Sequence, residues 1–428
     1  MTSPLRLGIA GLGTVGAGVV KIIQAHSDML VGRCGQEVKI SAVSARSRGK
    51  DRGVDLSEYV WEDDPVALAA RDDVDVFVEL IGGEDGPALE AVNAAIAAGK
   101  HVVTANKALL AHHGNELAEA AEVAGVNLRF EAAVAGGIPI IKALTEGLAG
   151  NKITRIMGVM NGTCNYILTR METAGLPYDE VFAEADALGY LEADPNLDVG
   201  GIDAAHKLVL LSAIGFGTRV DFASAELQGI GAISIDDIET AAELGYRIKL
   251  LGVAALGDEG LEQTMMPTLV PYHSPLGQLE GGTNMVVVEG DSVGQIVLRG
   301  AGAGEGPTAS AVMGDVADIA RGISLPVFGQ AAKDLVAAKA APSSASSAWY
   351  IRLGLKDRAG TLARLAGALS DAGVSIDRLR QKAHQDDTAP VVIVTHSAEK
   401  SQIDAALEAI SATGDATTQP IALRIVEV

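Results

Sequence analysis

The sequence predicts an α/β protein of three units: a doubly wound parallel sheet first, an α+β unit second, and a small unit of βαββαβ order last. Three observations predict this class. Short apolar runs alternate with Ala-rich helical patterns from Leu5 to about Phe130, β-rich segments follow, and a small, polar, Pro-containing stretch sets off the last part of the chain. The 428 residues suffice for about three domains.

In the first unit, predicted for residues 1–134, strands and helices alternate. The clearest helical patterns, at 87–98 and 109–124, are each followed by a glycine, Gly99 and Gly125, where helices often end. The predicted strands lie at 6–10, 38–45, 74–80, 101–104 and 127–130.

The middle unit is predicted for residues 135–336, with its end packing back on the first unit. A linker is predicted for 337–348 and the last unit for 349–428. The linker contains the sequence AAPSSASS, which is typical of a flexible connection. In the middle unit we expect strands at 153–160, 263–269, 284–289 and 294–299 and helices at 178–188 and 202–214. In the last unit we expect strands at 349–355, 374–380, 391–395 and 421–428 and helices at 361–372 and 402–410.

Composition excludes several classes of function. The chain carries 33 Lys and Arg against 55 Asp and Glu, a formal net charge of −22. No Lys/Arg cluster is dense enough to form the basic face that phosphates require, so we expect small-molecule ligands rather than nucleic acid. No apolar run is long enough to span a bilayer, and the apolar N-terminal stretch lacks the charged start of a signal peptide. Cys34 and Cys164 are too few for a disulfide framework or a paired zinc site, which favours a reducing, cytoplasmic setting.

A glycine-rich turn, GLGTVG, follows the first predicted strand and opens a helix. Gly11 would allow the tight turn, Gly13 the approach of a pyrophosphate and Gly16 the packing of helix on strand. In this context the motif predicts a Rossmann-type dinucleotide site that includes Thr14 and Val15, although a plain glycine-rich turn has the same pattern.

The end of the second predicted strand indicates which dinucleotide binds. The sequence there is Ser44-Ala-Arg46-Ser-Arg48, which suits a 2′-phosphate better than the acidic residue typical of NAD sites. We therefore expect NADP to be preferred, with NAD possible, unless Arg46 and Arg48 are ordinary exposed loop residues.

Acidic residues crowd the segment around residues 190–207, next to a predicted helix. Asp203 and Lys207 lie four apart in the helix at 202–214 and therefore share a face. A solvated salt bridge would have the same spacing. Glu192, Asp194 and Asp198 crowd the same region, however, and such crowding favours a bound cation or cationic group.

Several separate motifs, in one order, resemble those of the homoserine dehydrogenases, in the long bacterial form with a C-terminal ACT domain of ferredoxin-like βαββαβ order. The resemblance covers essentially the whole chain. It implies reversible reduction of L-aspartate 4-semialdehyde to L-homoserine with NAD(P)H, in threonine, methionine and isoleucine biosynthesis. The motifs lie at 11–16, 104–107, 131–139, 161–163, 192–207 and 302–304.

The resemblance implies roles for residues of the reaction site. Lys207 would donate the proton to the developing alkoxide, and Asp203 would orient it, although Lys107 could also transfer that proton or merely cap a helix. Glu192 would bind the substrate ammonium group and Asp198 would complete the polar wall. Further substrate contacts are expected at Gly162, Thr163 and Tyr190, and further cofactor contacts at Thr104, Lys107 and Gly304.

Two further ligands are implied by the resemblance. A monovalent cation such as sodium would lie at Glu131, Val134, Gly136 and Ile138, although the same residues are compatible with a simple turn. L-threonine would bind the last unit as an effector.

The effector contacts would involve Asp357 and Gly360, unless this unit serves only for dimerisation. The family and the extra unit suggest a homodimer or homotetramer.

Two other functions are compatible with part of the pattern. An acylating aldehyde dehydrogenase of the aspartate-semialdehyde type would need Cys164 as its nucleophile. A nonenzymatic amino-acid sensor would keep the fold without the chemistry, yet Lys107, Glu192, Asp203 and Lys207 are all present.

Overall fold

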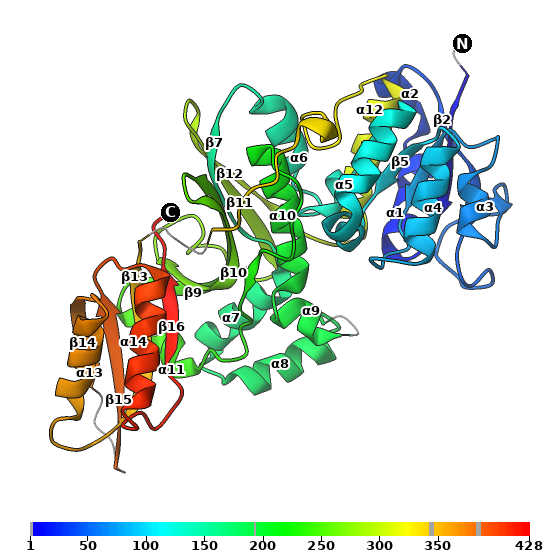
Figure 1. Ribbon diagram of the computed structural model, residues 1–428. Coiled ribbons are helices and arrows are strands. Elements are labelled where there is room, and N and C mark those ends of the chain that lie inside the picture. Colours follow the sequence, from blue (N-terminus) through cyan, green and yellow to red (C-terminus); the bar gives the residue numbers. More distant parts are fainter. Residues whose placement is uncertain (1–2, 192–193, 342–345, 382–386) are drawn as a thin grey trace.

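The three predicted units follow one another along an elongated molecule (Figure 1). The computed structural model describes residues 3–191, 194–341, 346–381 and 387–428. In Figure 1 the N-terminal unit lies at one end, the C-terminal unit at the other, and the middle unit joins them. The predicted α/β class is confirmed, with one parallel and one mixed sheet.

The N-terminal unit is built on a six-stranded parallel sheet in the order β3-β2-β1-β4-β5-β6. Because β2 and β4 flank β1 on opposite sides, the strand order reverses there, and open α/β sheets bind ligands at that point. The strands are β1 (Leu5–Ala10), β2 (Val38–Ser44), β3 (Val60–Trp61), β4 (Val76–Glu79), β5 (His101–Thr104) and β6 (Leu128–Arg129). The helices are α1 (Thr14–Ala25), α2 (Ser27–Cys34), α3 (Pro65–Ala69), α4 (Pro87–Ala97) and α5 (Lys107–Ala124).

One helix of the N-terminal unit comes from much later in the chain. Helix α12 (Glu305–Ala320) packs against α1, and a Cβ on Gly18 would lie 2.9 Å from the carbonyl oxygen of Glu305. Glycine at this position therefore permits the close approach of the two helices. The packing also brings residues 302–304 back to the start of α1.

The middle and C-terminal units share a single mixed sheet of ten strands. Its order is β12-β11-β7-β9-β10-β16-β13-β15-β14, with β8 paired to β10. The strands of the middle unit are β7 (Ile153–Val159), β8 (Glu226–Leu227), β9 (Tyr246–Gly257), β10 (Gly260–Pro271), β11 (Thr283–Gly290) and β12 (Gly294–Ala301). Those of the C-terminal unit are β13 (Ala348–Lys356), β14 (Ile376–Gln381), β15 (Thr388–Thr395) and β16 (Ile421–Ile425).

Helices α10 (Ile202–Phe216), α7 (Gly162–Ala174) and α11 (Ile235–Glu243) pack on the middle part of the shared sheet. Helix α10 packs on β7, β9 and β10 and against α5, and most of its residues are buried. The other α-helices of these two units are α6 (Ile140–Lys142), α8 (Tyr178–Ala187), α9 (Pro195–Val199), α13 (Thr361–Asp371) and α14 (Lys400–Ala412). Short helical turns occur at Glu131–Ala133, Ala143–Gly147 and Ala332–Asp334. The predicted βαββαβ order of the C-terminal unit is confirmed by β13, α13, β14, β15, α14 and β16.

Buried polar contacts hold the C-terminal unit to the middle unit. Strands β10 and β16 pair in parallel, with Thr268 opposite Arg424, and Arg424 forms a buried ion pair with Glu262. Asp237, at the start of α11, is fully buried and accepts hydrogen bonds from Tyr350 Oη at 2.8 Å and Arg352 Nε at 2.6 Å. The two units are therefore joined by strand pairing and buried charge as well as by the chain.

Part of the predicted linker contacts this sheet. The carbonyl oxygen of Lys339 accepts from Leu261 N at 2.8 Å, and Ala341 N donates to Leu261 O at 3.0 Å. Residues 342–345 lie outside the described residues. Among the described helices, none has the length and apolar character needed to cross a membrane.

Candidate active site

A cavity of about 690 Å³ lies where the N-terminal and middle units meet. The start of α1 forms one wall, and the starts of α7 and α10 form another. Helix α12 returns the 302–304 segment to the same place. Among the lining residues are Thr14, Val15, Lys107, Gly136, Gly162, Thr163, Tyr166, Tyr190, Asp198, Asp203, Lys207, Asn284 and Gly304.

The glycine-rich turn has the geometry of a phosphate site. Gly11 has φ +98°, and a Cβ there would lie 2.2 Å from the carbonyl oxygen of Leu80. A Cβ on Gly16 would lie 2.0 Å from the carbonyl oxygen of Gly11, whereas one on Gly13 would meet nothing within 4 Å. Gly13 is also the N-cap of α1 and supplies no side-chain cap, so the first amides of that helix are oriented toward an incoming anion.

The loop after β2 is fastened to the glycine-rich turn by a residue that the sequence analysis did not single out. Arg52 donates to Leu12 O at 3.0 Å and to Ser47 O at 2.6 Å. Arg48 lies over the ring of Trp61, 5.8 Å from its centroid, while Arg46 is exposed. Arg46 therefore extends from a loop whose backbone is held in place.

Thr104 acts on the site through the start of α5. Its Oγ1 donates at 2.5 Å to Glu79, which is fully buried, and accepts from Asn106 N at 2.9 Å. Asn106 in turn caps α5 by accepting from Leu109 N at 3.1 Å. This chain of bonds fixes the first turn of α5, from which Lys107 extends into the cavity.

Two lysines from different helices meet on one buried carboxylate. Lys107 Nζ lies 2.7 Å from Asp203 Oδ1, and Lys207 Nζ lies 2.7 Å from Asp203 Oδ2. Asp203 is only 8% exposed. Burial by itself would raise the pKa of Asp203, but Lys207 and Lys107 outweigh it and hold that pKa well below its ordinary value. The carboxylate is therefore ionised and orients both ammonium groups.

Lys207 is held by a second contact. Its ammonium group also donates to Met160 O at 2.7 Å. An ammonium group has three N–H donors, and contacts with described residues account for two of them, so the third can bond to an oxygen of a molecule in the cavity. The sequence spacing predicts the pairing of Asp203 with Lys207, whereas the contact with Lys107 depends on the packing of α5 against α10.

The residues expected to bind substrate line the opposite wall. Thr163 Oγ1 donates to Tyr190 O at 2.9 Å, and the rings of Tyr166 and Tyr190 pack edge to face with centroids 4.9 Å apart. Asp198 is buried and accepts from Asn161 Nδ2 at 2.9 Å. Gly162 lies beside them at the first position of α7. Glu192 lies outside the described residues.

Three residues that line the cavity were given no role by the sequence analysis: Asn161, which it includes only in the 161–163 motif, Tyr166 and Asn284. Asn161 lies at the N-cap of α7, and the signal that could have found it is an Asn directly after a buried strand and before Gly-Thr. Tyr166 has no such signal, because an aromatic residue in a helix is usually part of a core. Asn284 reaches the cavity only through the pairing of β11.

The residues proposed for a cation lie in a turn between β6 and α6. Ala135 and Gly136 have φ +56° and +53°, and Gly136 lines the cavity. The Glu131 carboxylate accepts from Ile141 N and Lys142 N, both at 2.9 Å.

The protonation of Glu131 and the set of oxygen atoms in this turn determine how a cation could bind there. Burial and the nearby Asp315 raise the pKa of Glu131 to about 7. Among the described residues, no group of three His, Cys, Asp or Glu side chains is arranged for a metal. A cation here would therefore depend mainly on the backbone oxygens of Val134, Gly136 and Ile138.

The position of Cys164 does not suit a nucleophile. The side chain is fully buried, its Sγ donates to Asp198 O at 3.2 Å, and burial raises the pKa of its thiol well above the ordinary value. A thiol in this state supplies little thiolate to a substrate.

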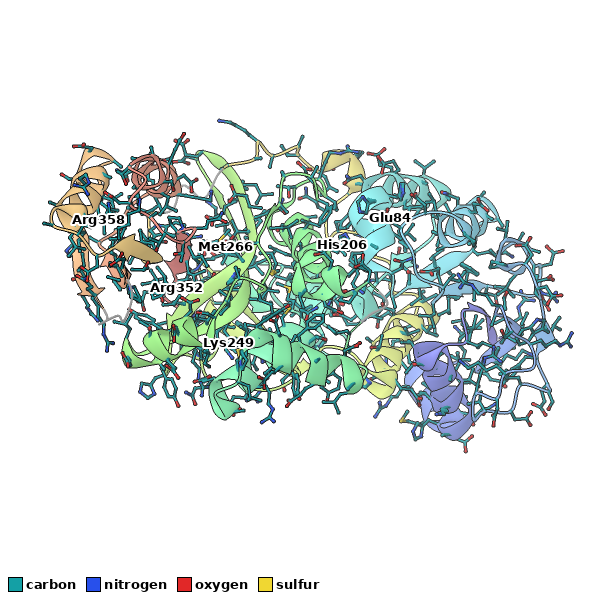
Figure 2. All side chains as sticks on the ribbon, turned by 90° about the horizontal axis from the view of Figure 1, so that it is seen from below. Glu84, His206, Lys249, Met266, Arg352 and Arg358 are labelled. Carbon is teal, nitrogen blue, oxygen red and sulfur yellow. The ribbon has the colours of Figure 1, made fainter. Side chains whose placement is uncertain are left out.

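The residues expected to bind an effector lie in a separate cavity of the C-terminal unit, with a volume of about 240 Å³. Asp357 and Gly360 are in the loop between β13 and α13, and Gln381 and Val391 come from β14 and β15. Gly360 has φ +89° and is the N-cap of α13. Figure 2 shows Arg358 of this loop in the C-terminal unit, far along the molecule from His206 of α10.

Fold and cavity together define a class of protein: a dehydrogenase with a Rossmann-type domain and a lysine–carboxylate site. Family models described as homoserine dehydrogenase NAD-binding domain, homoserine dehydrogenase and ACT domain match residues 11–131, 139–317 and 349–415. A homoserine dehydrogenase of Neisseria gonorrhoeae is 45% identical, with 98% of each chain covered. The chain belongs to the homoserine dehydrogenase family.

Other relatives extend the comparison to solved structures. A homoserine dehydrogenase of Pseudomonas aeruginosa is 41% identical, with 99% of each chain covered. The crystal structure of a homoserine dehydrogenase from Thiobacillus denitrificans has a TM-score of 0.94 and 40% identity over 99% of each chain. A hyperthermophilic archaeal homoserine dehydrogenase in complex with NADPH has a TM-score of 0.65 and 27% identity over 75% of this chain and 99% of its own.

Proposed function

We propose that this chain catalyses the reversible, NAD(P)H-dependent reduction of L-aspartate 4-semialdehyde to L-homoserine. The observation that carries the proposal is Asp203 bridging Lys107 and Lys207 in a cavity that also reaches the phosphate-binding turn. The same reaction supports a place in threonine, methionine and isoleucine biosynthesis, and the cysteine content supports a cytoplasmic setting.

In the proposed mechanism, residues of this chain stabilise the negative charge that develops on the substrate oxygen and supply its proton. When bound, a reduced nicotinamide dinucleotide supplies the hydride for the aldehyde carbon. Lys207 donates an N–H to the aldehyde oxygen, stabilises the negative charge that develops there and then transfers a proton to it. Asp203 holds Lys207 in place, and Lys107, on the other carboxylate oxygen, is the alternative donor.

Substrate orientation is proposed for the other wall of the cavity. Gly162, Thr163 and Tyr190 would contact the amino-acid part of the substrate, and Asp198 would complete the polar wall. Glu192, which lies outside the described residues, would bind the ammonium group.

We propose that NADP is the preferred cofactor, with NAD as an alternative. The exposed Arg46, on a loop fastened by Arg52, supports this preference, as does the NADPH complex of the archaeal relative. Arg46→Ala is expected to raise the KM for NADP by about 10- to 100-fold, the value of one charged hydrogen bond, and to leave the KM for NAD unchanged. Equal effects on both cofactors would contradict this assignment.

Sodium binding at the 131–138 turn is also part of the proposal. Glu131 and the backbone oxygens of Val134, Gly136 and Ile138 would hold the ion, which would stiffen the turn beside the cavity. The expected result is higher activity in sodium chloride than in a tetraalkylammonium salt of equal ionic strength.

Feedback by L-threonine through the C-terminal unit completes the proposal. Asp357 and the loop ending at Gly360 would bind the amino acid, and a homodimer or homotetramer would present the paired sites. Asp357→Asn is expected to weaken threonine inhibition without changing uninhibited turnover. Light scattering measures the oligomeric state, and a monomer would contradict the assembly.

The experiment that tests the activity follows reduced-nicotinamide absorbance with L-homoserine and NADP or NAD. Wild-type protein is expected to reduce the cofactor, and Lys207→Ala to abolish this reduction. Absence of turnover with both cofactors would refute the proposal and favour a sensor.

A further inference from the structure

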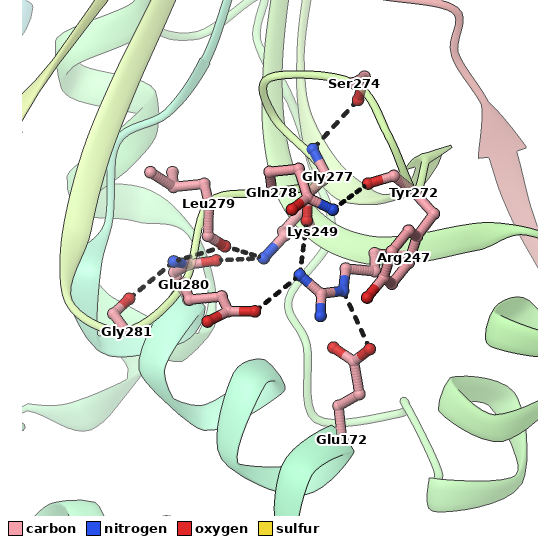
Figure 3. Close-up of polar contacts among 11 residues, drawn as sticks. Glu172, Arg247, Lys249, Tyr272, Ser274, Gly277, Gln278, Leu279, Glu280 and Gly281 are labelled. Carbon is pink, nitrogen blue, oxygen red and sulfur yellow. Dashed lines mark hydrogen bonds and ion pairs between the residues drawn. The ribbon is translucent and has the colours of Figure 1, made fainter.

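Strand β9 carries two buried cations that the proposed mechanism does not use. Arg247 and Lys249 lie two residues apart and therefore on the same face, toward α7 and the loop that joins β10 to β11 (Figure 3). Lys249 is 2% exposed and Arg247 8%. Figure 2 labels Lys249 in the middle unit.

The two cations have different partners. Arg247 is neutralised by Glu172 of α7 and Glu280 of the loop, both at 3.0 Å, and lies over the ring of Tyr272. Lys249 instead donates to neutral oxygens, at 2.9 Å to Asn165 Oδ1 and more closely to the Leu279 carbonyl. Burying an ammonium group against neutral acceptors lowers the stability of the folded protein, so we expect Lys249 to have a functional role.

The contacts of Lys249 lead directly to the active-site cavity. Asn165, which receives its hydrogen bond, donates its own Nδ2 to Gly281 O at 2.7 Å. The next residue, Gly282, lies against the first turn of α7, because a Cβ on Gly162 would be 2.6 Å from its carbonyl oxygen. Gly162 and Gly282 both line the cavity.

The strand that follows this loop brings a further polar group to the cavity. Asn284 is 1% exposed and lines the cavity wall. Within the part of the chain that the structure describes, its buried Oδ1 has no hydrogen-bond partner, so packing alone positions this acceptor. The position of the 279–284 segment therefore determines where this acceptor lies.

We propose that Lys249 is a positioning residue of the substrate site: its ammonium group fastens the 279–284 segment to α7 and so fixes the wall formed by Gly162, Gly282 and Asn284. This inference rests on the proposed dehydrogenase activity. Lys249 does not touch the cavity, so it acts only through Asn165 and the loop.

The proposal has a pH signature. Burial, assisted by Arg247 and opposed by Glu172 and Glu280, lowers the pKa of Lys249 to about 8. Above that pH the amine becomes neutral and its two hydrogen bonds lose their charge assistance. Substrate affinity is therefore expected to fall on the alkaline side with a midpoint near the pKa of Lys249.

The test is the steady-state kinetics of homoserine oxidation across the alkaline range. Lys249→Met removes the charge and leaves an unbranched side chain one heavy atom shorter. It is expected to raise the KM for L-homoserine about tenfold while the KM for the cofactor stays within about twofold. Its alkaline decline in kcat/KM should disappear. Lys152→Met, at an exposed lysine just before β7, is the matched control and should behave as wild type.

A second variant keeps the proposal testable if Lys249→Met does not fold. Asn165→Asp places a carboxylate beside the ammonium group, so it should move the alkaline decline to higher pH. An unchanged homoserine KM in Lys249→Met, or an unmoved decline in Asn165→Asp, would overturn the inference. Wild-type protein without homoserine oxidation would instead overturn the proposed function on which it rests.

Discussion

Replacing Asp203 by Asn removes the charge that orients both lysines while keeping the shape of the side chain. Each lysine contact, at 2.7 Å, is a charge-assisted hydrogen bond of about 1.5–3 kcal/mol. Asn offers one acceptor oxygen in place of two, so one bond is lost and the other loses its charge assistance, at a cost of about 3 kcal/mol. At 1.36 kcal/mol per tenfold change, kcat/KM should fall about 150-fold.

The assay is homoserine-dependent cofactor reduction, with circular dichroism to show that the variant folds. Asp179→Asn, at an exposed carboxylate of α8, is the control and should retain activity within about twofold. Cofactor affinity should change less than kcat/KM in Asp203→Asn, because only Lys107 of the two lysines is also expected to contact the cofactor. A loss in kcat/KM of less than about fivefold would refute the reasoning, since a solvated salt bridge is worth at most about 1 kcal/mol.

Three further outcomes follow from buried groups. Cys164→Ser should keep kcat/KM within about threefold, whereas a collapse of turnover would favour thioester chemistry. Burial lowers the pKa of His206 to about 4, below its value in the unfolded chain, so as the pH falls the unfolded chain takes up a proton before the folded protein does. Wild type should therefore lose about 2 kcal/mol of its free energy of unfolding between about pH 7 and pH 5, and His206→Leu should not lose it. Urea denaturation at both pH values measures this, and equal losses in the two proteins would contradict it. Asp237→Asn should lower the free energy of unfolding by about 3 kcal/mol because Arg352 loses its buried partner, while Asp236→Asn, exposed on the same turn, should be nearly neutral.

Elements with regular patterns could be predicted from the sequence, and elements stabilised by distant contacts could not. The β1 and β5 strands and the α4 and α10 helices lie close to their expected bounds because their apolar periodicity is uninterrupted. Strand β9 is not among the predicted strands, because Arg247 and Lys249 interrupt its apolar run. Their burial depends on partners in α7 and in the loop after β10.

Helix α12 and the pairing that forms the shared sheet could not be predicted from the sequence for a different reason. The start of α12 reads Gly304-Glu-Gly-Pro307, which resembles a loop until α1 supplies a surface for it. The pairing of Thr268 with Arg424 joins segments far apart in the sequence, and nothing local in either strand indicates its partner.

In the candidate site, too, contacts within one element could be predicted and contacts between elements could not. Asp203 and Lys207 share a helix, so their pairing follows from spacing alone. Lys107 joins them only because α5 packs against α10, and Asn284 reaches the cavity only through the pairing of β11. Motif and periodicity thus locate the residues on each element, whereas the contacts between elements require the structure.

The shared sheet also sets an order of assembly during protein synthesis. Among the described strands, β16 is the last in sequence, yet it lies between β10 and β13. While the chain is being made, the middle unit can fold, and β8 and the 339–341 segment pair with part of the β10 edge. The stretch at Thr268 and Leu269 has no partner until β16 is made, and an open edge of this kind invites pairing with other chains. Completion of the C-terminal unit therefore closes a surface prone to aggregation, and a nascent or prematurely terminated chain would be a natural client for chaperones.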